Sequence, residues 1–445
     1  MRTKVCVIGA GPAGLMAAIF SAEGGSSTMV IEANTTAGQK LLITGAGRCN
    51  ITHQAGPVEI VRGFGAKGKF LSFCLYQYPP KFVQNFFAGL GLRLKIEKDS
   101  CVFPVSDRAG DVRDVLVTRA NKLGVRFLYG RRVSSIVKEN GTFVVRIAKE
   151  PVYAEKLIVA TGGLSWPKTG STGDGYRFAQ QFGHRIIEPK PSLVPLVTCE
   201  DWPKQLAGTA VEDIRVSARI NKKKITTTGA IIFTDDGIGG PAVLDMSRYL
   251  TDYLPDVGIP IGPQWDTGTR RGATVGYPTW CPICHCCPRG ILISLDLAPK
   301  VIEAELERKI TELIAANPKK KVDNILAEFV PKRFSAILCR QVGCSDEFAA
   351  SQLKKDVRKK LVRLLKALPL SVVNTRPIEE AVVTHGGVSV TEIEPKTMES
   401  KICPGLFFAG EVLDADGPCG GYNLQMCWST GALAGLSAAK TTDDG

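Results

Sequence analysis

The most specific chemical signal in the sequence is a run of glycines close to its start. Gly9, Gly11 and Gly14 have the spacing GxGxxG, with Ala13 inside the run, and they stand between an apolar segment and a segment rich in Ala and Leu. In a strand–turn–helix unit the first glycine makes the tight turn, the second lets a pyrophosphate approach the backbone, and the third lets the helix pack on the sheet. The helix N-terminus then attracts phosphate through its N–H groups and its dipole. The pattern predicts a dinucleotide site, with a purely structural glycine turn as the alternative.

An acidic residue follows at the distance that such a site requires. Glu32 ends the second predicted strand, 28–32, and lies eighteen residues after the last glycine. A carboxylate there would accept hydrogen bonds from ribose hydroxyls and repel a 2′-phosphate. With a first strand at 4–9 and a helix at 13–23, the N-terminal segment predicts one βαβ unit.

Two further segments have the composition of cofactor contacts. An apolar strand at 157–160 ends in small residues, and a strand at 405–409 ends in Gly410 and Glu411 before a glycine turn and a helix to about residue 439. A carboxylate at this second place could bond ribityl hydroxyls, and the helix N-terminus could stabilise the negative charge of a reduced flavin. Three separated elements predict an extended cofactor, which favours FAD over NAD.

Residues 38–52, GQKLLITGAGRCNIT, resemble the GxKLLxTGxGRCNxTN segment of the BaiN and aminoacetone oxidase-like family of FAD-dependent oxidoreductases. Residues 166–175, 233–241, 386–388, 396–400 and 410–425 are similar to the same family, and the resemblance covers nearly the whole chain except about 252–289. It implies an FAD domain interrupted by a β-barrel-like unit and a small helical unit. Some members reduce C=C bonds of steroid-like enones and others oxidise small amines, so the resemblance leaves the substrate open. The residues expected to hold FAD are Gly9, Gly11, Ala13, Gly14, Glu32, Ala33, Lys40, Leu41, Arg48, Cys49, Asn50, Val133, Ala160, Thr161, Gly162, Gly410, Glu411, Asp414, Gly421, Asn423 and Leu424.

Two cations and a thiol lie in the glycine-rich loop of this motif. Lys40 and Arg48 could hold the pyrophosphate or a flavin carbonyl, and the alternative is an ordinary surface charge. Cys49 beside them could be redox active, but it has no CxxC or CxxxxC partner. Packing or simple contact with FAD is therefore the favoured interpretation of Cys49.

His385 and Tyr422 are the candidate catalytic residues. His385 lies directly before Gly386 and Gly387, and the family pattern usually has a small residue at position 385. An imidazole has a pKa suited to proton donation near neutral pH. Tyr422 lies at the predicted flavin end, and its phenol could donate to a carbonyl. A structural histidine and simple packing of the tyrosine are the alternatives.

The alternation of apolar and polar residues predicts the domain organisation. We expect an α/β protein with a Rossmann-like FAD-binding domain in two parts, 1–190 and 373–445. Between them we expect a β-rich substrate domain at 191–298, with a loop insertion at 252–289, and a helical unit at 299–372 whose last helix has leucines on one face from Leu353 to Leu368.

Composition excludes several classes of protein. In 445 residues, 44% hydrophobic and 22% charged residues indicate a globular chain, and no apolar run is long enough for a membrane span. The 14 cysteines are too few for a disulfide scaffold, and no secretory signal is evident, so we expect a cytoplasmic protein. The group Cys281 to Cys287 has one CxxC knuckle, for which an inert loop, a redox cluster and a metal site stay open, and no metal is assigned.

The net charge of +13 favours phosphate-bearing or acidic partners. Basic residues recur from Lys354 to Lys366, opposite the leucine face, where a solvated surface is the default interpretation and nucleic-acid contact the alternative. No recognised RNA module is present, so a nucleic-acid partner is expected to be unlikely, and the oligomeric state stays unknown.

These observations predict an oxidoreductase that transfers hydride between FAD and a small organic substrate. The preferred direction is reduction of an activated C=C with electrons from NADH or NADPH. Because only one GxGxxG is present, the nicotinamide would bind transiently in the substrate cleft. The alternatives are an amine oxidase that produces hydrogen peroxide and, in another class, a flavoprotein that modifies RNA.

Overall fold

The computed structural model describes residues 1–97, 99–148, 150–254, 290–344 and 348–440. The chain divides into two compact units, one of residues 1–191 with 378–445 and one of residues 192–377. Their boundaries lie close to those expected at 190 and 372, and the β-rich and helical parts between them form one unit. Most of the 252–289 insertion, including the Cys281 to Cys287 group, lies outside the described residues.

A mixed sheet forms the core of the first unit. Its strands follow the order β6-β2-β1-β9-β8-β7. β8 pairs with residues 152–154 of β9, and β18 pairs with residues 157–159 of the same strand. The strands are β1 (Arg2–Ile8), β2 (Thr28–Ile31), β6 (Arg126–Leu128), β7 (Ser135–Glu139), β8 (Thr142–Arg146), β9 (Val152–Val159) and β18 (Leu406–Phe408). β1, β2, β6, β9 and β18 are parallel, and so their carboxyl ends meet at one edge. This arrangement confirms the predicted Rossmann-like fold.

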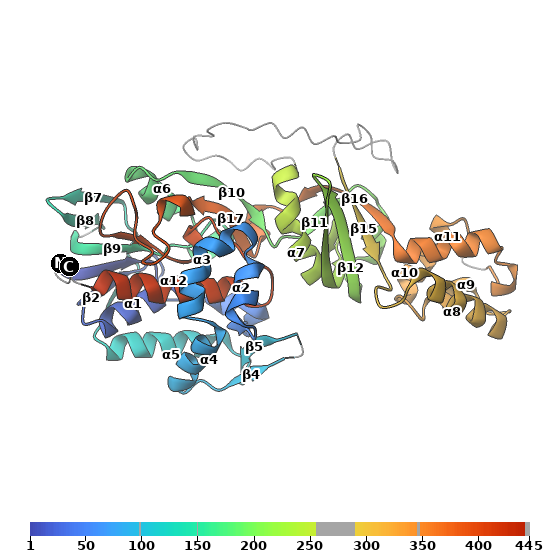
Figure 1. Cartoon of the computed structure of the whole chain (residues 1–445), viewed down its shortest axis with the longest axis horizontal. Coiled ribbons are helices and arrows are strands. Elements are labelled where there is room, and N and C mark those ends of the chain that lie inside the picture. The colour runs from blue at the N-terminus through green and yellow to red at the C-terminus, as the bar shows by residue number, and fades with distance from the viewer. Residues whose placement is uncertain (98, 149, 255–289, 345–347, 441–445) are drawn as a thin grey trace. The chain divides into compact units, whose positions relative to one another are not determined.

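Two long helices run side by side along one face of this sheet (Figure 1), α1 (Pro12–Glu23) and α12 (Tyr422–Ala439). Glycine permits their close contact, because a Cβ on Gly431 or Gly435 would lie 2.4 or 2.2 Å from a carbonyl oxygen of α1. The first unit also contains α2 (Pro57–Gly63), α3 (Gly68–Gln77), α4 (Pro80–Gly89), α5 (Ala109–Lys122) and α6 (Asp174–Gln181), the antiparallel sheet of β3 (Thr52–His53), β5 (Cys101–Pro104) and β4 (Leu94–Ile96), and the pair β10 (Ile186–Ser192) and β17 (Val383–Val388).

A closed barrel forms the β-rich part of the second unit, with the order β11-β14-β13-β12-β15-β16. Its strands are β11 (Leu196–Thr198), β12 (Ala210–Ile220), β13 (Lys223–Phe233), β14 (Gly237–Gly239), β15 (Ile291–Asp296) and β16 (Leu368–Thr375). Along β12 the buried residues Ile214, Val216, Ala218 and Ile220 alternate with more exposed ones, as a strand with one face in a core requires. The predicted barrel-like unit is confirmed.

Helices complete the second unit: α7 (Pro241–Leu250), α8 (Glu303–Ala316), α9 (Val322–Leu326), α10 (Lys332–Gln341) and α11 (Lys355–Lys366). One detail of the prediction was wrong. The last helix ends at Lys366, so that Leu368 belongs to β16. No helix in the described part of the chain is long and apolar enough to cross a membrane.

Candidate functional site

Three glycines shape the turn between β1 and α1. Gly9 has a φ of +98°, and a Cβ there would lie 2.5 Å from the carbonyl oxygen of Ala160. A Cβ on Gly14 would lie 1.9 Å from the carbonyl oxygen of Gly9, so the helix can start this close to the turn only with glycine. A Cβ on Gly11 would instead meet nothing within 4 Å. The structure therefore leaves open space where the sequence predicts the pyrophosphate.

The start of α1 is suited to bind an anion. No side chain caps the helix, and its first turn holds no acidic residue. The first N–H groups of an α-helix have no acceptor within the helix, and its N-terminus carries a partial positive charge. A phosphate group would satisfy both the hydrogen bonds and the charge.

Glu32, directly after β2, has a carboxylate that its neighbours hold in place. Its Oε2 accepts the N–H of Ala10 at 2.7 Å, and its Oε1 accepts the backbone and side-chain N–H groups of Asn34 at 2.8 and 2.9 Å. Asn34 also donates to the carbonyl oxygen of Thr169 at 3.0 Å. Carboxylate oxygens keep further lone pairs, so this fixed group can still accept ribose hydroxyls. Sequence reasoning missed Asn34, because its partner Thr169 is far away in the chain.

The middle and C-terminal segments meet the glycine turn in space. Gly9 lies against Ala160, as described above, and a Cβ on Gly410 would lie 2.6 Å from the Cβ of Ala13. The N–H of Gly410 donates to the hydroxyl of Thr430 on α12 at 3.0 Å. The three segments predicted to share one cofactor therefore converge at the carboxyl ends of β1, β9 and β18.

Thr161 supplies an unsatisfied polar group at this convergence. Its Oγ1 is buried and has no hydrogen-bond partner among the described residues. Gly162 next to it has a φ of +74° and approaches Ser171, whose hydroxyl oxygen would lie 2.9 Å from an added Cβ. Since buried hydroxyls normally find a partner, the Thr161 hydroxyl fits a site that a polar ligand completes.

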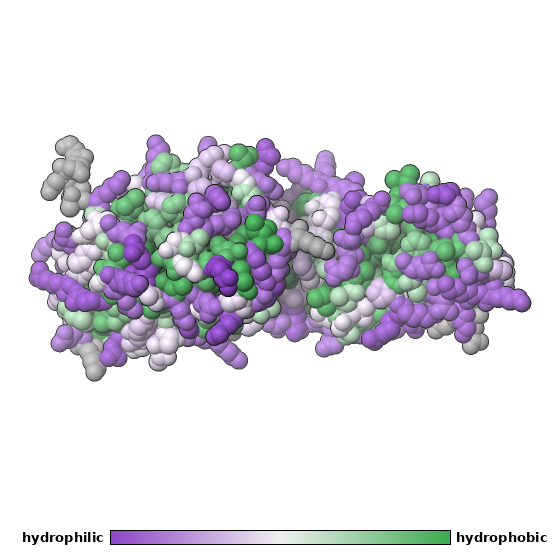
Figure 2. Space-filling model, turned by 90° about the horizontal axis from the view of Figure 1, so that it is seen from below, coloured by the Kyte–Doolittle hydropathy of each residue, from purple (hydrophilic) through white to green (hydrophobic). Residues whose placement is uncertain are grey.

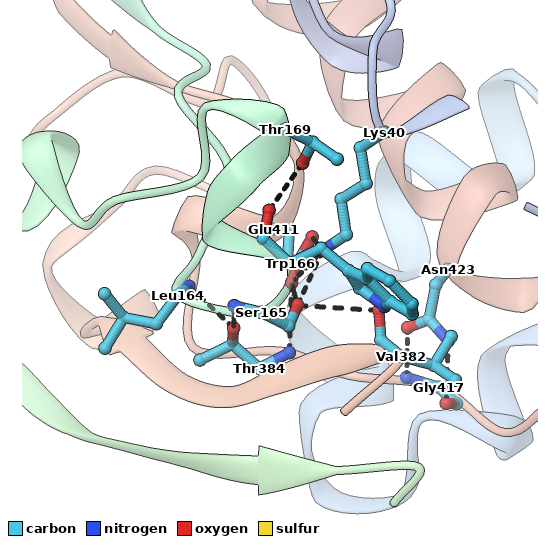
Figure 3. A network of polar contacts seen from close by, with 10 residues as sticks. All are labelled: Lys40, Leu164, Ser165, Trp166, Thr169, Val382, Thr384, Glu411, Gly417 and Asn423. Atoms are coloured by element: carbon cyan, nitrogen blue, oxygen red, sulfur yellow. Dashed lines mark hydrogen bonds and ion pairs between the residues drawn. The ribbon is translucent and has the colours of Figure 1, made fainter. Parts of the chain in front are cut away.

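Lys40 and Glu411 form an ion pair at the centre of a polar network (Figure 3). Lys40 Nζ lies 2.7 and 2.9 Å from the two carboxylate oxygens of Glu411 and donates to the Ser165 hydroxyl at 2.6 Å. Glu411 Oε1 also accepts the Ser165 hydroxyl at 2.9 Å and the N–H of Thr384 at 3.0 Å. The Thr384 hydroxyl in turn accepts the N–H of Leu164 at 2.8 Å. The sequence indicated Lys40 and Glu411, but nothing in it marked Ser165 or Thr384.

The Arg48 guanidinium contacts residues of, and next to, the antiparallel sheet of β3, β5 and β4. Its Nη1 lies 2.8 Å from Glu97 Oε1, and the group stacks over the ring of Phe103 at 4.1 Å from the centroid. The side chain is 39% exposed. In this structure Arg48 therefore supports the loop after residue 40, and its expected contact with pyrophosphate or flavin stays a prediction.

Cys49 is fully buried, and burial raises the pKa of its thiol to about 12. A neutral buried thiol is a poor nucleophile, which supports packing over redox chemistry. Asn50 beside it joins two parts of the site: with its amide oriented to satisfy both neighbours, it accepts the N–H of Gly421 at 3.2 Å and donates to the carbonyl oxygen of Thr52 at 3.0 Å.

His385 on β17 is paired with a buried carboxylate that sequence reasoning missed. Its Nδ1 lies 2.8 Å from Oδ1 of Asp416, and the two side chains are 23% and 8% exposed. Asp414, two residues earlier, pairs with Lys67, and burial raises the pKa of the Asp414 carboxyl above its ordinary value. The segment that begins at Glu411 thus supplies two carboxylates, of which Asp414 pairs with Lys67 and Asp416 contacts His385.

Tyr422 and Asn423 begin α12. The Tyr422 ring packs against His53 and Phe64 with centroid distances of 5.1 and 6.3 Å and is 9% exposed. Asn423 fixes the preceding loop, because its amide accepts the N–H of Gly417 at 2.7 Å and donates to the carbonyl of Gly417 at 2.9 Å. These contacts support the packing alternative for Tyr422. Among the other residues expected to contact FAD, Leu41 and Val133 are buried, Leu424 is partly buried and Ala33 is exposed.

The residues fit an FAD. The open space at Gly11, the orphaned Thr161 hydroxyl and the fixed Glu32 carboxylate offer room for a pyrophosphate and partners for hydroxyl groups. The contact of each side chain with the cofactor stays a prediction, as does the catalytic role of His385.

The chain is similar to several known proteins. The family described as HI0933-like protein Rossmann domain matches residues 3–437. The chain is 29% identical to a 3-dehydro-bile acid delta(4,6)-reductase of Clostridium scindens, over 98% of this chain and 99% of that protein. It is 30% identical to a ribosomal RNA dihydrouridine synthase of Escherichia coli, over 99% and 100%. A solved structure with a TM-score of 0.48 and 16% identity is a 3-ketosteroid-delta4-(5alpha)-dehydrogenase of Rhodococcus jostii, with coverage of 99% and 97%.

Proposed function

Because the chain belongs to the family of HI0933-like proteins, which are flavin-dependent oxidoreductases, we propose that it reduces a C=C bond conjugated with a carbonyl group. The family match confirms the resemblance seen in the sequence. The single observation that carries the choice of reaction is the His385–Asp416 pair, in which a carboxylate of the segment that starts at Glu411 holds a candidate proton donor.

The chain's own residues would bind the cofactor and orient it. The turn from Gly9 to Gly14 would hold the pyrophosphate, Glu32 the ribose, and the segment after Gly410 the flavin end. When bound, FAD supplies the hydride that reaches the substrate. Lys40 and Glu411 neutralise one another and so keep this partly buried region close to electrically neutral.

His385 would finish the reaction. Hydride addition at the β-carbon of an enone leaves an enolate, which must take a proton at the α-carbon. In the imidazolium form Asp416 would accept Nδ1–H and stabilise the charged ring, and Nε2–H would be the proton given to the substrate. The product is the saturated carbonyl compound, and His385 is reprotonated from solvent.

The proposal includes NADH or NADPH as the reductant, bound transiently, and a cytoplasmic location. Buried free thiols such as those of Cys6, Cys74 and Cys427 suit a reducing compartment and support the location. The single GxGxxG turn leaves the nicotinamide without a Rossmann unit of its own, and this supports transient binding.

Two substrate classes follow from the names of the relatives. A bile acid reductase acts on an enone in a steroid-like ring, which agrees with the preferred sequence interpretation. A dihydrouridine synthase acts on uracil, whose C5=C6 bond is conjugated with the C4 carbonyl, so the same hydride and proton transfers apply. Uracil in RNA is therefore the second candidate, and it brings back the RNA-modifying alternative.

The test is anaerobic oxidation of NADH and NADPH by the purified holoenzyme with a panel of steroid enones, cyclohexenone and a uridine-containing RNA. We expect stoichiometric saturation of one of these substrates, detected by mass spectrometry as a gain of two hydrogens. Release of hydrogen peroxide with small amines, and no saturated product from any member of the panel, would support the oxidase alternative and overturn the proposal.

A further inference from the structure

The exposed face of α11 carries cations that have no acidic partners. The helix contains six basic residues and one acidic residue, and it buries Leu361, Val362 and Leu365 on its other face. Lys359, Lys360 and Arg363 are exposed. Within the described part of the chain, none of these three forms an ion pair. Figure 1 shows α11 at the surface of the helical group formed by α8 to α11.

Several other cations of the same helical group are paired. On α8, Arg308 lies 2.7 Å from Glu312 and Lys309 lies 3.4 Å from Glu305, each at the i,i+4 spacing that stabilises a helix. Lys320 lies 3.3 Å from Glu328. Hydrophilic side chains cover most of the outer end of this group in Figure 2, so exposed charge alone does not distinguish α11. α11 differs in its balance of charge, because its one acidic residue, Asp356, stands against six basic residues.

The charges of α11 oppose the stability of the helix. Lys355 and Lys359, and Lys359 and Arg363, are i,i+4 pairs of like charge, which repel. Lys354 is the N-cap and Lys355 the first residue of the helix, where the positive end of the helix dipole disfavours a cation. Lys366 differs, because it donates to Asp296 at 2.8 Å and to two carbonyl oxygens and thus anchors the helix. Folding therefore accounts for Lys366 but not for the exposed row.

We propose that the row Lys355, Lys359, Lys360 and Arg363 is a docking face for the phosphate backbone of RNA. Residues four apart on a helix lie about 6 Å apart along its axis, so Lys355, Lys359 and Arg363 make a line of positive charge about 12 Å long. Such a line binds a polyanion by releasing counterions and reads no sequence. This inference rests on the RNA form of the proposed function, in which the uracil to be reduced is part of a long RNA that needs a second point of attachment.

The test compares two triple variants with the same change in charge. The α11 triple removes three unpaired cations and combines Lys359→Gln, Lys360→Gln and Arg363→Gln. The control triple removes three paired cations and combines Arg308→Gln, Lys309→Gln and Lys320→Gln. The probe is a fluorescein-labelled single-stranded RNA of mixed sequence, and anisotropy gives Kd at several salt concentrations. We expect the α11 triple to weaken binding at least about tenfold and to lower the slope of log K against log salt by about 2, since each phosphate contact contributes about 0.7. We expect the control triple to bind nearly as the parent chain does.

Thermal unfolding and cyclohexenone reduction keep the outcomes separate. Removal of repelling charges should leave the melting temperature of the α11 triple unchanged or higher, whereas the control triple should lose some stability. Equal loss of RNA binding in both triples would show that only net charge matters and would overturn the inference. So would parent-chain binding to phosphatidylserine vesicles without binding to RNA. Cyclohexenone reduction should be the same in the parent chain and in the α11 triple, so a failure of the reaction itself would be seen independently of RNA binding.

Discussion

Gly11 differs from the other two glycines of the phosphate turn, because a side chain at this position would enter open space and would not strain the backbone. Its φ is −74°, and a Cβ there meets no atom within 4 Å. We therefore expect Gly11→Val to fold normally and to lose FAD, since its side chain fills the space that the pyrophosphate needs. Flavin absorbance after purification and after reconstitution measures the loss. Gly14→Ala is the matched variant, in which the fold itself should be damaged, and a normally loaded Gly11→Val would show that the turn has been misassigned.

Glu32 has two roles that one substitution can separate. Its carboxylate fixes the turn through Ala10 and Asn34 and is expected to accept ribose hydroxyls. We expect Glu32→Ala to weaken FAD binding by about 1 to 3 kcal/mol, the range for a charge-assisted hydrogen bond. Calorimetric titration of the apoprotein gives the affinity, and urea unfolding of the apoprotein shows how much of the effect is structural. Unchanged affinity would place the adenosine elsewhere.

His385 and Asp416 are testable as an acid and its positioning residue. We expect His385→Ala to leave FAD content and flavin reduction by NAD(P)H nearly intact while it slows substrate reduction by about 10² or more. Asp416→Asn should slow the same step less and shift the pH profile of kcat, because an amide cannot stabilise the imidazolium. Stopped-flow measurement of the two half-reactions distinguishes the cases. Equal loss in both half-reactions would indicate a structural role for His385.

Local sequence signals predicted correctly those helices and turns whose formation depends on residues close together in the chain. The expected helix at 13–23 is α1. Asn140 and Gly141, a pair of residues typical of tight hairpin turns, connect β7 and β8, and both have positive φ. Leu368 was misassigned because its helical spacing continues past Lys366, and only pairing with β15 shows that it is in a strand.

The polar partners of the site could not be predicted in the same way. Lys40 and Glu411 lie next to glycine-rich motifs, and these motifs identified them as candidates. No motif marks Ser165, Thr384 or Asp416, whose roles depend on contacts with segments distant in the chain. Arg48 shows the converse. The motif around Arg48 predicted a contact with the cofactor. In the structure its guanidinium pairs with Glu97 and stacks on Phe103, and no motif marks either residue.

A buried histidine between α6 and β10, His184, contacts the segment before β18, and from it we expect stability to depend on pH. His184 Nδ1 lies 3.2 Å from Glu392 Oε2, and its Nε2 lies 2.7 Å from the Ser400 hydroxyl. Burial lowers the pKa of His184 below its ordinary value, although Glu392 acts in the opposite direction. A histidine with a lowered pKa in the folded state contributes stability that is present above its unfolded pKa and lost as the pH falls.

We therefore expect the free energy of unfolding of the parent chain to decrease between about pH 7.5 and pH 5.5, and His184→Gln to show a smaller decrease. Urea unfolding of the apoprotein at the two pH values measures the difference between them. An identical decrease in the parent chain and in His184→Gln would exclude this histidine as its source.

At the scale of the whole molecule, one unit contains every residue expected to hold FAD, and the other contains the barrel and the basic helix. The interrupted FAD domain explains why the cofactor segments lie at the start, in the middle and at the end of the chain. Binding of the cofactor and recognition of a large substrate can thus be changed separately by mutation, which the α11 variants and the Gly11 variant exploit.

The central claim is that this chain holds FAD and uses it to saturate a conjugated C=C bond. The most direct measurement is an anaerobic spectral titration, in which the purified yellow protein is first reduced with NADH or NADPH and then mixed with steroid enones or uridine-containing RNA. The account predicts that the flavin absorbance is bleached by the nicotinamide and returns in the absence of oxygen with one equivalent of substrate, which is recovered saturated. A protein that carries no flavin after reconstitution, or a reduced flavin that only oxygen can reoxidise, would contradict it.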